Sequence, residues 1–213
     1  MSWLGKLFGN KTPIADGTTP PAPQDPENDQ PDDGLLFGPA DALNEEADRL
    51  MSVNRPADAL SAMDAAIACL HESLAVCQDS PDRGRWLGEL YDKQASIKVQ
   101  LGDIDGANKS LLDSWVTYRS LADRFPQQPH LRCDSAIALQ KIARVLMLQG
   151  CHANALKFIQ DASTIFADLA QQYPDEPNYR RFFGMMTELL SQCMNALGHS
   201  DIAAQLQRPT ETT

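Results

Sequence analysis

Apolar residues recur every three or four positions from about residue 39 to residue 207, which is the spacing of amphipathic helices. The pattern is clearest over residues 131–148 and over residues 152–172. The first stripe consists of Ala136, Leu139, Ile142, Ala143, Leu146 and Met147, and the second of Ala155, Leu156, Ile159, Ala162, Phe166 and Leu169. Gly150 separates the two stretches and Pro174 follows the second, so the sequence predicts a helix pair.

This helix pair is one unit of an internal repeat. Gly102, Gly150 and Gly198 stand 48 residues apart. The same step relates Ala59, Ala107, Ala155 and Ala203, and also Pro81, Pro129 and Pro177. A fixed period of this size is typical of stacked repeat proteins, in which each unit contacts mainly its neighbours. The sequence therefore predicts an all-α solenoid of stacked antiparallel helix pairs.

The period divides the helical part into four units, 39–80, 81–128, 129–176 and 177–207, followed by a tail at 208–213. In the first unit Asn54 stands at the glycine step, and asparagine also tolerates a left-handed backbone. The predicted helices are 40–53 and 56–77, 85–101 and 104–125, 131–148 and 152–172, and 179–197 and 199–207. The last helix is short and ends in polar residues, which suits the closing helix of a solenoid.

Small residues mark the expected contacts between the helices of a pair. They are Ala47, Ala95, Ala143 and Ser191 in the first helices, and the alanine series that includes Ala155 in the second. Over residues 39–207 the chain resembles an extended, long-helix variant of the tetratricopeptide family, whose own period is 34 residues. It departs from the family consensus at the tryptophan position, which holds Tyr91, Leu139 and Thr187. Other α-solenoids, with periods of about 40–47 residues, remain an alternative.

The resemblance implies a concave groove lined by first-helix residues, and with it a protein or peptide ligand. The positions that correspond are Asp92, Ser96, Gln140, Arg144, Glu188 and Gln192. Arg144 is the expected ligand contact, because it lies on the central first helix with units on both sides. Chaperone-binding relatives hold a carboxylate with Lys and Asn at such places. Asp92 and Ser96 argue against that ligand here.

Residues 1–38 have a different composition from the rest. Six prolines and several acids lie between Lys11 and Asp33, which predicts a disordered acidic arm. The arm begins with a short apolar motif, Trp3, Leu4, Leu7 and Phe8, that would occupy one face of a helix. Three interpretations stay open: a frayed terminus, a docking peptide, and a weak membrane-surface anchor.

Basic residues follow each proline step: Arg83, Arg85, Arg132, Arg180 and Arg181. Equivalent positions of a stacked solenoid line one edge, so these residues predict a basic ridge. The ridge would be either a solvated edge or a site for an acidic peptide, such as the arm of the protein itself.

Composition narrows the function classes. The net charge of −11 and pI of about 4.7 oppose sequence-independent nucleic-acid binding, which depends on Lys and Arg. No apolar run is long enough to cross a bilayer. The odd number of cysteines and the lack of a C-x-x-C pair favour a reducing cytoplasm over a disulfide framework.

Two clusters contain residue types that serve in chemical sites. Cys151 and His152 are adjacent, but no second pair is spaced to complete a zinc tetrahedron. His199, Ser200 and Asp201 are the residue types of a triad, yet a triad forms by convergence in space rather than by adjacency. We expect no catalytic residues, metal or cofactor.

These observations predict a non-enzymatic cytoplasmic adaptor or scaffold that binds a peptide or helix of unidentified sequence. The alternative is a structural protein that self-assembles through its repeats and is tethered to a membrane surface by its N-terminus. The sequence leaves the oligomeric state open, because either function is compatible with stacked units.

Overall fold

The computed structural model describes residues 33–76 and 80–206. In this part of the chain it contains eight α-helices and no strand. The helices are α2 (Asp33–Ser52), α3 (Pro56–Val76), α4 (Pro81–Gln100), α5 (Ile104–Arg124), α6 (Pro129–Leu148), α7 (His152–Gln172), α8 (Pro177–Ala196) and α9 (Ser200–Leu206).

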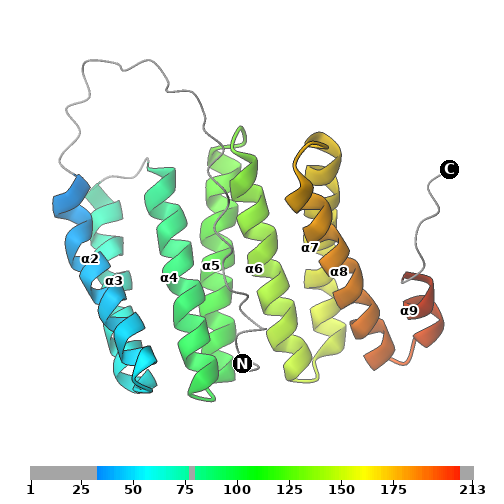
Figure 1. Cartoon of the computed structure of the whole chain (residues 1–213), viewed down its shortest axis with the longest axis horizontal. Coiled ribbons are helices and arrows are strands. Elements are labelled where there is room, and N and C mark those ends of the chain that lie inside the picture. Colours follow the sequence, from blue (N-terminus) through cyan, green and yellow to red (C-terminus); the bar gives the residue numbers. More distant parts are fainter. Residues whose placement is uncertain (1–32, 77–79, 207–213) are drawn as a thin grey trace.

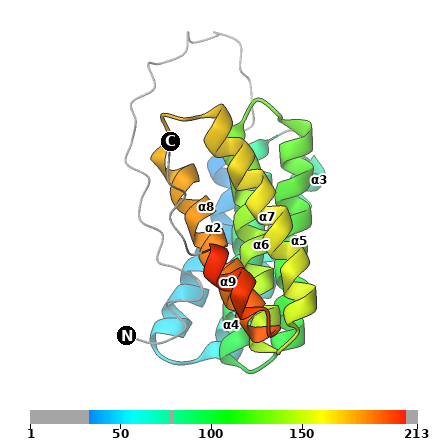
Figure 2. The ribbon, with the colours of Figure 1, turned by 90° about the vertical axis from the view of Figure 1, so that its right-hand side faces the viewer.

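The helices form two layers. Each helix packs mainly against the helices that precede and follow it in the chain. The first helices of the units, α2, α4, α6 and α8, stand in one row across Figure 1. Turning the molecule shows α3, α5 and α7 on the opposite side from α2 and α8 (Figure 2). The predicted all-α solenoid of stacked antiparallel helix pairs is therefore confirmed.

Each helix pair is joined by the same tight turn. Gly102, Gly150 and Gly198 have φ values of +78°, +73° and +86°, and Asn54 has a φ of 59°. The amide N–H of the following residue donates to a carbonyl five residues back, as from Cys151 to Leu146 at 2.9 Å. This Schellman-type closure satisfies carbonyls that the helix end would otherwise leave without a donor.

The small residues predicted at the helix contacts are all buried. Ala47, Ala95, Ala143 and Ser191 have no exposed surface in the first helices. Ala59, Ala107, Ala155 and Ala203 are equally buried in the second helices. The core then continues along the solenoid in successive clusters, with Phe166, Met63 and Leu111 among its largest buried side chains.

Three predicted helix starts were wrong. The first helices of the later units begin at Pro81, Pro129 and Pro177 rather than two to four residues beyond them. Proline is favoured at the first helical position because its fixed φ suits a helix and its missing N–H has no partner there anyway. The prolines therefore start the next helix as well as separating it from the previous one.

Helix α2 starts at Asp33, inside the last residues of the predicted arm at 1–38, and it contains Pro39. Ala40, Leu43, Ala47 and Leu50 recur at helical spacing directly after Pro39, which favours one continuous helix on that side of the proline. Residues 1–32 of the predicted arm and the predicted tail at 208–213 lie outside the described residues.

Candidate binding surfaces

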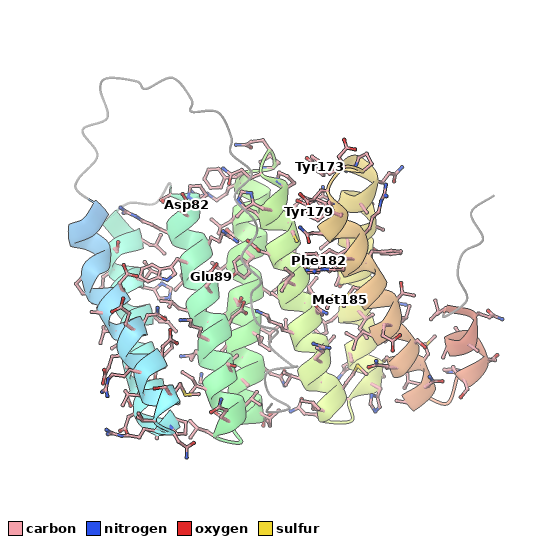
Figure 3. All side chains as sticks on the ribbon, viewed as in Figure 1. Asp82, Glu89, Tyr173, Tyr179, Phe182 and Met185 are labelled. Atoms are coloured by element: carbon pink, nitrogen blue, oxygen red, sulfur yellow. The ribbon has the colours of Figure 1, made fainter. Side chains whose placement is uncertain are left out.

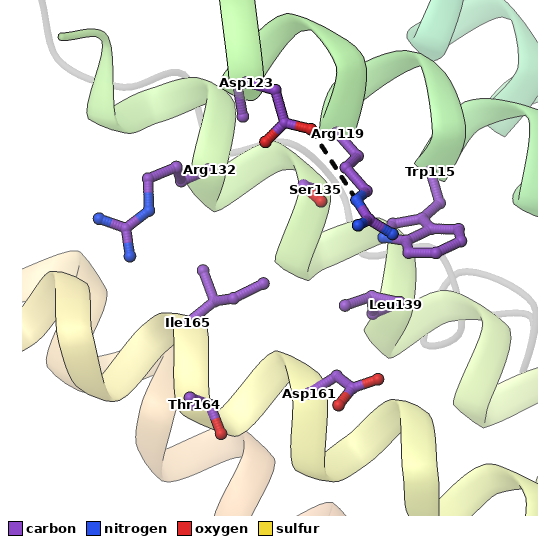
Figure 4. Close-up of a pocket in the computed structure, with 10 residues that line it drawn as sticks. Trp115, Arg119, Asp123, Arg132, Ser135, Leu139, Asp161, Thr164 and Ile165 are labelled. Atoms are coloured by element: carbon purple, nitrogen blue, oxygen red, sulfur yellow. Dashed lines mark ion pairs between the residues drawn. The ribbon is translucent and has the colours of Figure 1, made fainter. Parts of the chain in front are cut away.

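A hollow opens between α5 and α7, with α6 as its floor. It encloses about 400 Å³. Ten residues line it: Trp115, Arg119, Ala122 and Asp123 from α5, Arg132, Ser135 and Leu139 from α6, and Asp161, Thr164 and Ile165 from α7. Figure 4 shows Ile165 and Leu139 between the polar side chains of the three helices. A volume of this order suits one or two side chains of a bound segment.

The hollow and the equivalent seam one unit earlier differ at two positions of their first helices. Leu87 of α4 is buried there, whereas the residue 48 positions later is Ser135. Tyr91 of α4 reaches across to α3, and its hydroxyl lies 2.7 Å from Nε2 of His71. The residue equivalent to Tyr91 is Leu139, which is too short and apolar to make such a bridge. Loss of side-chain volume at these two positions leaves the gap.

Charges surround the apolar floor of the hollow. The Arg119 guanidinium lies 5.4 Å from the centre of the Trp115 ring, within the range of a cation–π contact. Arg119 Nε also lies 4.0 Å from Oδ2 of Asp123 (Figure 4). On the opposite wall Asp161 is exposed. The hollow thus combines apolar contact area with carboxylates on two of its walls.

Arg132 lies at one end of the hollow and is tied to α7. It donates from Nη1 to the Gln172 side chain at 3.1 Å, and its Nη2 lies 3.5 Å from the Asp168 carboxylate. These bonds hold Arg132 against the α7 side of the seam. A ligand would therefore find Arg132 already paired, and the apolar floor more accessible than this charge.

Sequence reasoning missed the hollow, apart from Arg132. Two pairs of positions 48 residues apart carry the only signal for it. They are Leu87 with Ser135, and Tyr91 with Leu139. Both pairs could be read from the sequence, but their consequence depends on how far apart α5 and α7 stand. Periodicity does not specify that distance.

The predicted groove residues do not form a continuous exposed strip. Gln140 is buried. Asp92 accepts a hydrogen bond from the Ser114 hydroxyl at 2.8 Å and another from the Lys141 ammonium at 2.6 Å. Lys141 and Asp92 are both largely buried, so this ion pair ties α6 to α4. Its position makes Asp92 a structural residue.

The same bond recurs one unit earlier. Lys93 of α4 donates to the Asn44 side chain of α2 at 2.7 Å, and both residues precede the Lys141–Asp92 pair by 48 positions. Lys93 also pairs with Asp48 at 2.7 Å. In the last unit the equivalent lysine position holds Leu189, which is buried instead. The first helices are thus connected by a repeated polar contact that ends at α8.

The other four predicted groove residues are at least partly accessible. Ser96 and Arg144 are half-buried, and burial lowers the pKa of the Arg144 guanidinium. Glu188 and Gln192 are exposed and bonded to each other, with 2.9 Å between the amide nitrogen and the carboxylate. Their role in ligand binding stays a prediction.

The predicted basic ridge is interrupted. Arg83 is buried, and Arg85 forms an ion pair with Asp134 of α6 at 2.6 Å. Burial of that carboxylate raises its pKa despite the neighbouring guanidinium. Together with the bonds of Arg132, this leaves Arg180 and Arg181 as the members with exposed side chains. Arg85 and Arg132 hold helices together because the solenoid brings acids from α6 and α7 within reach.

The N-terminal part of α8 carries an aromatic cluster. Figure 3 shows Tyr179, Phe182 and Met185 along this helix, below Tyr173 of the preceding turn. Phe182 stacks on Phe166 of α7 with 5.3 Å between ring centres, and Tyr173 meets Tyr179 edge-on at 6.0 Å. The cluster attaches α8 to α7. The predicted docking motif Trp3, Leu4, Leu7 and Phe8 lies outside the described residues.

Cysteines and acids do not gather into a metal site in the described parts of the chain. Cys69, Cys133, Cys151 and Cys193 are free thiols, and burial raises the pKa of Cys133 to about 12. Among the described helices, none has the length and apolar content needed to cross a bilayer.

Comparison with known proteins gives neither a family nor a curated relative, since no family model and no curated protein matches the chain. Solved structures with some likeness include MamA AMB-1 (P212121), with a TM-score of 0.33 and 15% identity over 78% of this chain and 87% of that one. Another is BtubC (BKLC) from P. vanneervenii, with a TM-score of 0.27 and 14% identity over 84% of this chain and 95% of that one.

Proposed function

We propose that the chain is a non-enzymatic protein-binding module of an extended tetratricopeptide-like kind. It acts in a reducing cytoplasm, and it holds a segment of a partner protein in the hollow between α5 and α7. The observation that carries this proposal is the difference between two equivalent seams. One is filled by Leu87 and by the Tyr91–His71 contact, whereas the other is open and lined by Ser135.

The lining favours a segment with an apolar anchor next to a basic residue. Leu139 and Ile165 offer apolar contact area, and Trp115 offers an aromatic ring at the wall. Asp161 is exposed on the α7 wall, where it would attract a lysine or arginine beside the anchor, whereas Asp123 on the α5 wall is already paired with Arg119. The net charge of −11 acts in the same direction, because it speeds the approach of cationic ligands.

Selection of peptides on the full-length protein tests this proposal. A phage-displayed library of random 12-residue peptides supplies the probe, and titration calorimetry then measures each selected peptide. Ser135→Leu restores the residue found in the filled seam, so it should occupy the hollow. We expect it to weaken binding at least about tenfold, the loss of about 1.4 kcal/mol of binding free energy.

The matched control is Ser96→Leu, the same change on the predicted first-helix strip. It should leave the affinity unchanged, and melting curves of both variants check that they are folded. Asp161→Asn should weaken basic peptides and reduce the salt dependence of their binding. Peptides that lose affinity with Ser96→Leu but not with Ser135→Leu would place the binding surface on the first helices instead.

The alternative function is self-assembly through the repeats. The short helix α9 favours it, because its 7 residues, against 21 in α7, leave part of α8 uncovered among the described residues. Molar mass measured by light scattering over a hundredfold range of concentration separates the two functions. A binding module keeps a constant mass in the absence of its partner. An assembly protein gains mass as the concentration rises.

A further inference from the structure

Among the described residues, one side of α8 lacks a full-length helical neighbour. Helices α3, α5 and α7 each have 21 residues, whereas α9 has only 7. At 1.5 Å per residue the difference amounts to about 20 Å of helix. Helix α9 covers the C-terminal part of α8, where the Ser191 hydroxyl donates to the Ala203 carbonyl at 3.2 Å. Beyond α9, no described residue follows α8 to cover the N-terminal part of the same side.

Equivalent residues of α6 and α8 show how much is uncovered. Ser135 on α6 is 4% exposed, and its equivalent on α8, Phe183, is 40% exposed. Ala136 is fully buried, whereas its equivalent Gly184 is exposed. A Cβ atom at Gly184 would meet nothing within 4 Å, although one at Gly88 of α4 would collide with Tyr118 of α5. The open side of α8 is the side that a second helix covers in the earlier units.

Helix α7 forms a low wall beside this side of α8. The α5 residues Trp115 and Arg119 line the hollow, and the residues 48 positions later are Ser163 and Ala167 of α7. Both are small and half-buried. We name the surface formed by Ser163, Ala167, Phe183 and Gly184 the terminal slot. Because its lining includes three small residues, the terminal slot has room for large side chains.

We propose that the terminal slot binds the apolar N-terminal motif of this same chain, Trp3, Leu4, Leu7 and Phe8. The motif offers two aromatic and two leucine side chains on one helical face, which complement a lining of small residues around Phe183. This inference goes beyond the proposed function and does not rest on the hollow between α5 and α7.

Charge favours this occupant over others. Arg180 and Arg181 are exposed at the start of α8, within one turn of Phe183. The chain between the motif and α2 carries Asp16, Asp25, Glu27, Asp29 and Asp32. An acidic segment that follows the apolar motif would pass these two arginines and be attracted to them. The predicted site for an acidic peptide is thereby reduced to the two arginines at this end of the molecule.

The connecting chain is long enough. The N-terminal ends of α2 and α8 lie at the same end of the molecule, the top of Figure 1. Six helix-to-helix steps separate α2 from α8, which at 8–10 Å per step is at most about 60 Å. Residues 9–32 can span about 80 Å when fully extended. Tethering raises the effective concentration of the motif to the millimolar range, so even a weak contact would be occupied.

Hydrogen exchange of the full-length protein, followed by mass spectrometry, measures this contact directly. In the wild type we expect amides of residues 2–9 to exchange at least about tenfold more slowly than in an unstructured peptide, as for a Kd of about 0.1 mM at millimolar effective concentration. Phe183→Asp should abolish this protection. The control Val116→Asp introduces the same charge at a more exposed apolar residue on α5, 57% against 40% for Phe183, and should preserve the protection.

A reciprocal variant in the N-terminal motif tests whether misfolding of Phe183→Asp, rather than loss of the contact, removes the protection. Leu7→Asp lies outside the described helices and should speed exchange of the amides at residues 180–187 without altering those of α4 and α5. Exchange of residues 2–9 at the unstructured rate in the wild type would overturn the proposal. So would protection that disappears on tenfold dilution together with a fall in molar mass, because the slot would then be an interface between copies. Protection that survives Phe183→Asp in a folded variant would place the motif elsewhere.

Discussion

At the residue scale, four backbone positions close the four helix pairs with a left-handed conformation. Three are glycines, and the fourth is Asn54 with a φ of 59°. A Cβ atom at Gly150 would meet nothing within 4 Å, so a side chain there has room. The requirement for glycine is therefore a matter of backbone conformation alone, since a left-handed residue with a branched side chain crowds its own carbonyl.

Substitutions at Gly150 should follow this conformational preference. Gly150→Val should lower the free energy of unfolding by about 1–2 kcal/mol, whereas Gly150→Asn should cost clearly less. Urea unfolding followed by circular dichroism compares the two. Equal losses of unfolding free energy for the two variants would contradict this prediction. The cost would then come from a steric clash of the side chain with its surroundings rather than from the left-handed backbone at residue 150.

At the element scale, the second helices differ in how their N-termini are capped. Asp103 precedes α5, and its carboxylate accepts a hydrogen bond from the Gly106 N–H at 2.9 Å. Cys151 holds the equivalent place before α7, and its side chain makes no capping bond. One helix thus has a bonded cap, and the next relies on backbone turns such as the one from Asn154 N–H to the Cys151 carbonyl.

Exchanging the caps should change stability in opposite directions. Asp103→Ala should lower the free energy of unfolding by about 0.5–2 kcal/mol, while Cys151→Ala should leave it unchanged. Cys151→Asp should raise it by about 1 kcal/mol, because it supplies the missing acceptor at a helix N-terminus. Urea unfolding at neutral pH measures all three. A loss with Cys151→Asp would show that the backbone at that turn cannot bring a carboxylate to the helix N–H groups.

The helices themselves could be predicted from the sequence because periodicity and turn residues act locally. The stripe that includes Ala155 and Phe166 and the stop at Gly150 depend on nothing outside their own unit. The start of α2 at Asp33 was missed because proline-rich composition outweighed the short stripe that begins at Leu36. Local signals conflicted there, and the packing of Ala40 and Ala47 against α3 settled the outcome.

Candidate sites were harder to predict because they depend on contacts between units. Asp92 and Gln140 have the polarity of groove residues, yet one is paired with Lys141 and the other is buried. The hollow arises from the absence of volume at Ser135, and a sequence does not show which neighbour will fail to fill it. Arg85 similarly has the sequence position of a ridge residue, but the fold places Asp134 of α6 beside it and the two form an ion pair.

At the scale of the whole molecule, contacts run almost entirely between successive helices. Such a solenoid should respond to damage according to its place in the stack rather than uniformly. Ala155 and Ala203 allow a matched comparison, because they are equivalent and both fully packed. The Ala155 N–H donates to the Cys151 carbonyl at 3.0 Å, and the Ala203 N–H to the His199 carbonyl at 3.1 Å. Proline would remove either bond in the same local setting.

Proline at these two positions should therefore have unequal consequences. Ala155→Pro breaks α7, which both the third and fourth units need, so about 3 kcal/mol is lost and the melting temperature should fall by roughly 6–12 °C. Ala203→Pro should unfold only α9. Calorimetry should then show a melting temperature within about 2 °C of the wild type. Hydrogen exchange should accelerate in α9 and in α8 around Ser191, and stay unchanged in α4 and α5. Equal falls in melting temperature would contradict nearest-neighbour stability, because they would require the short terminal helix to be coupled to the whole stack.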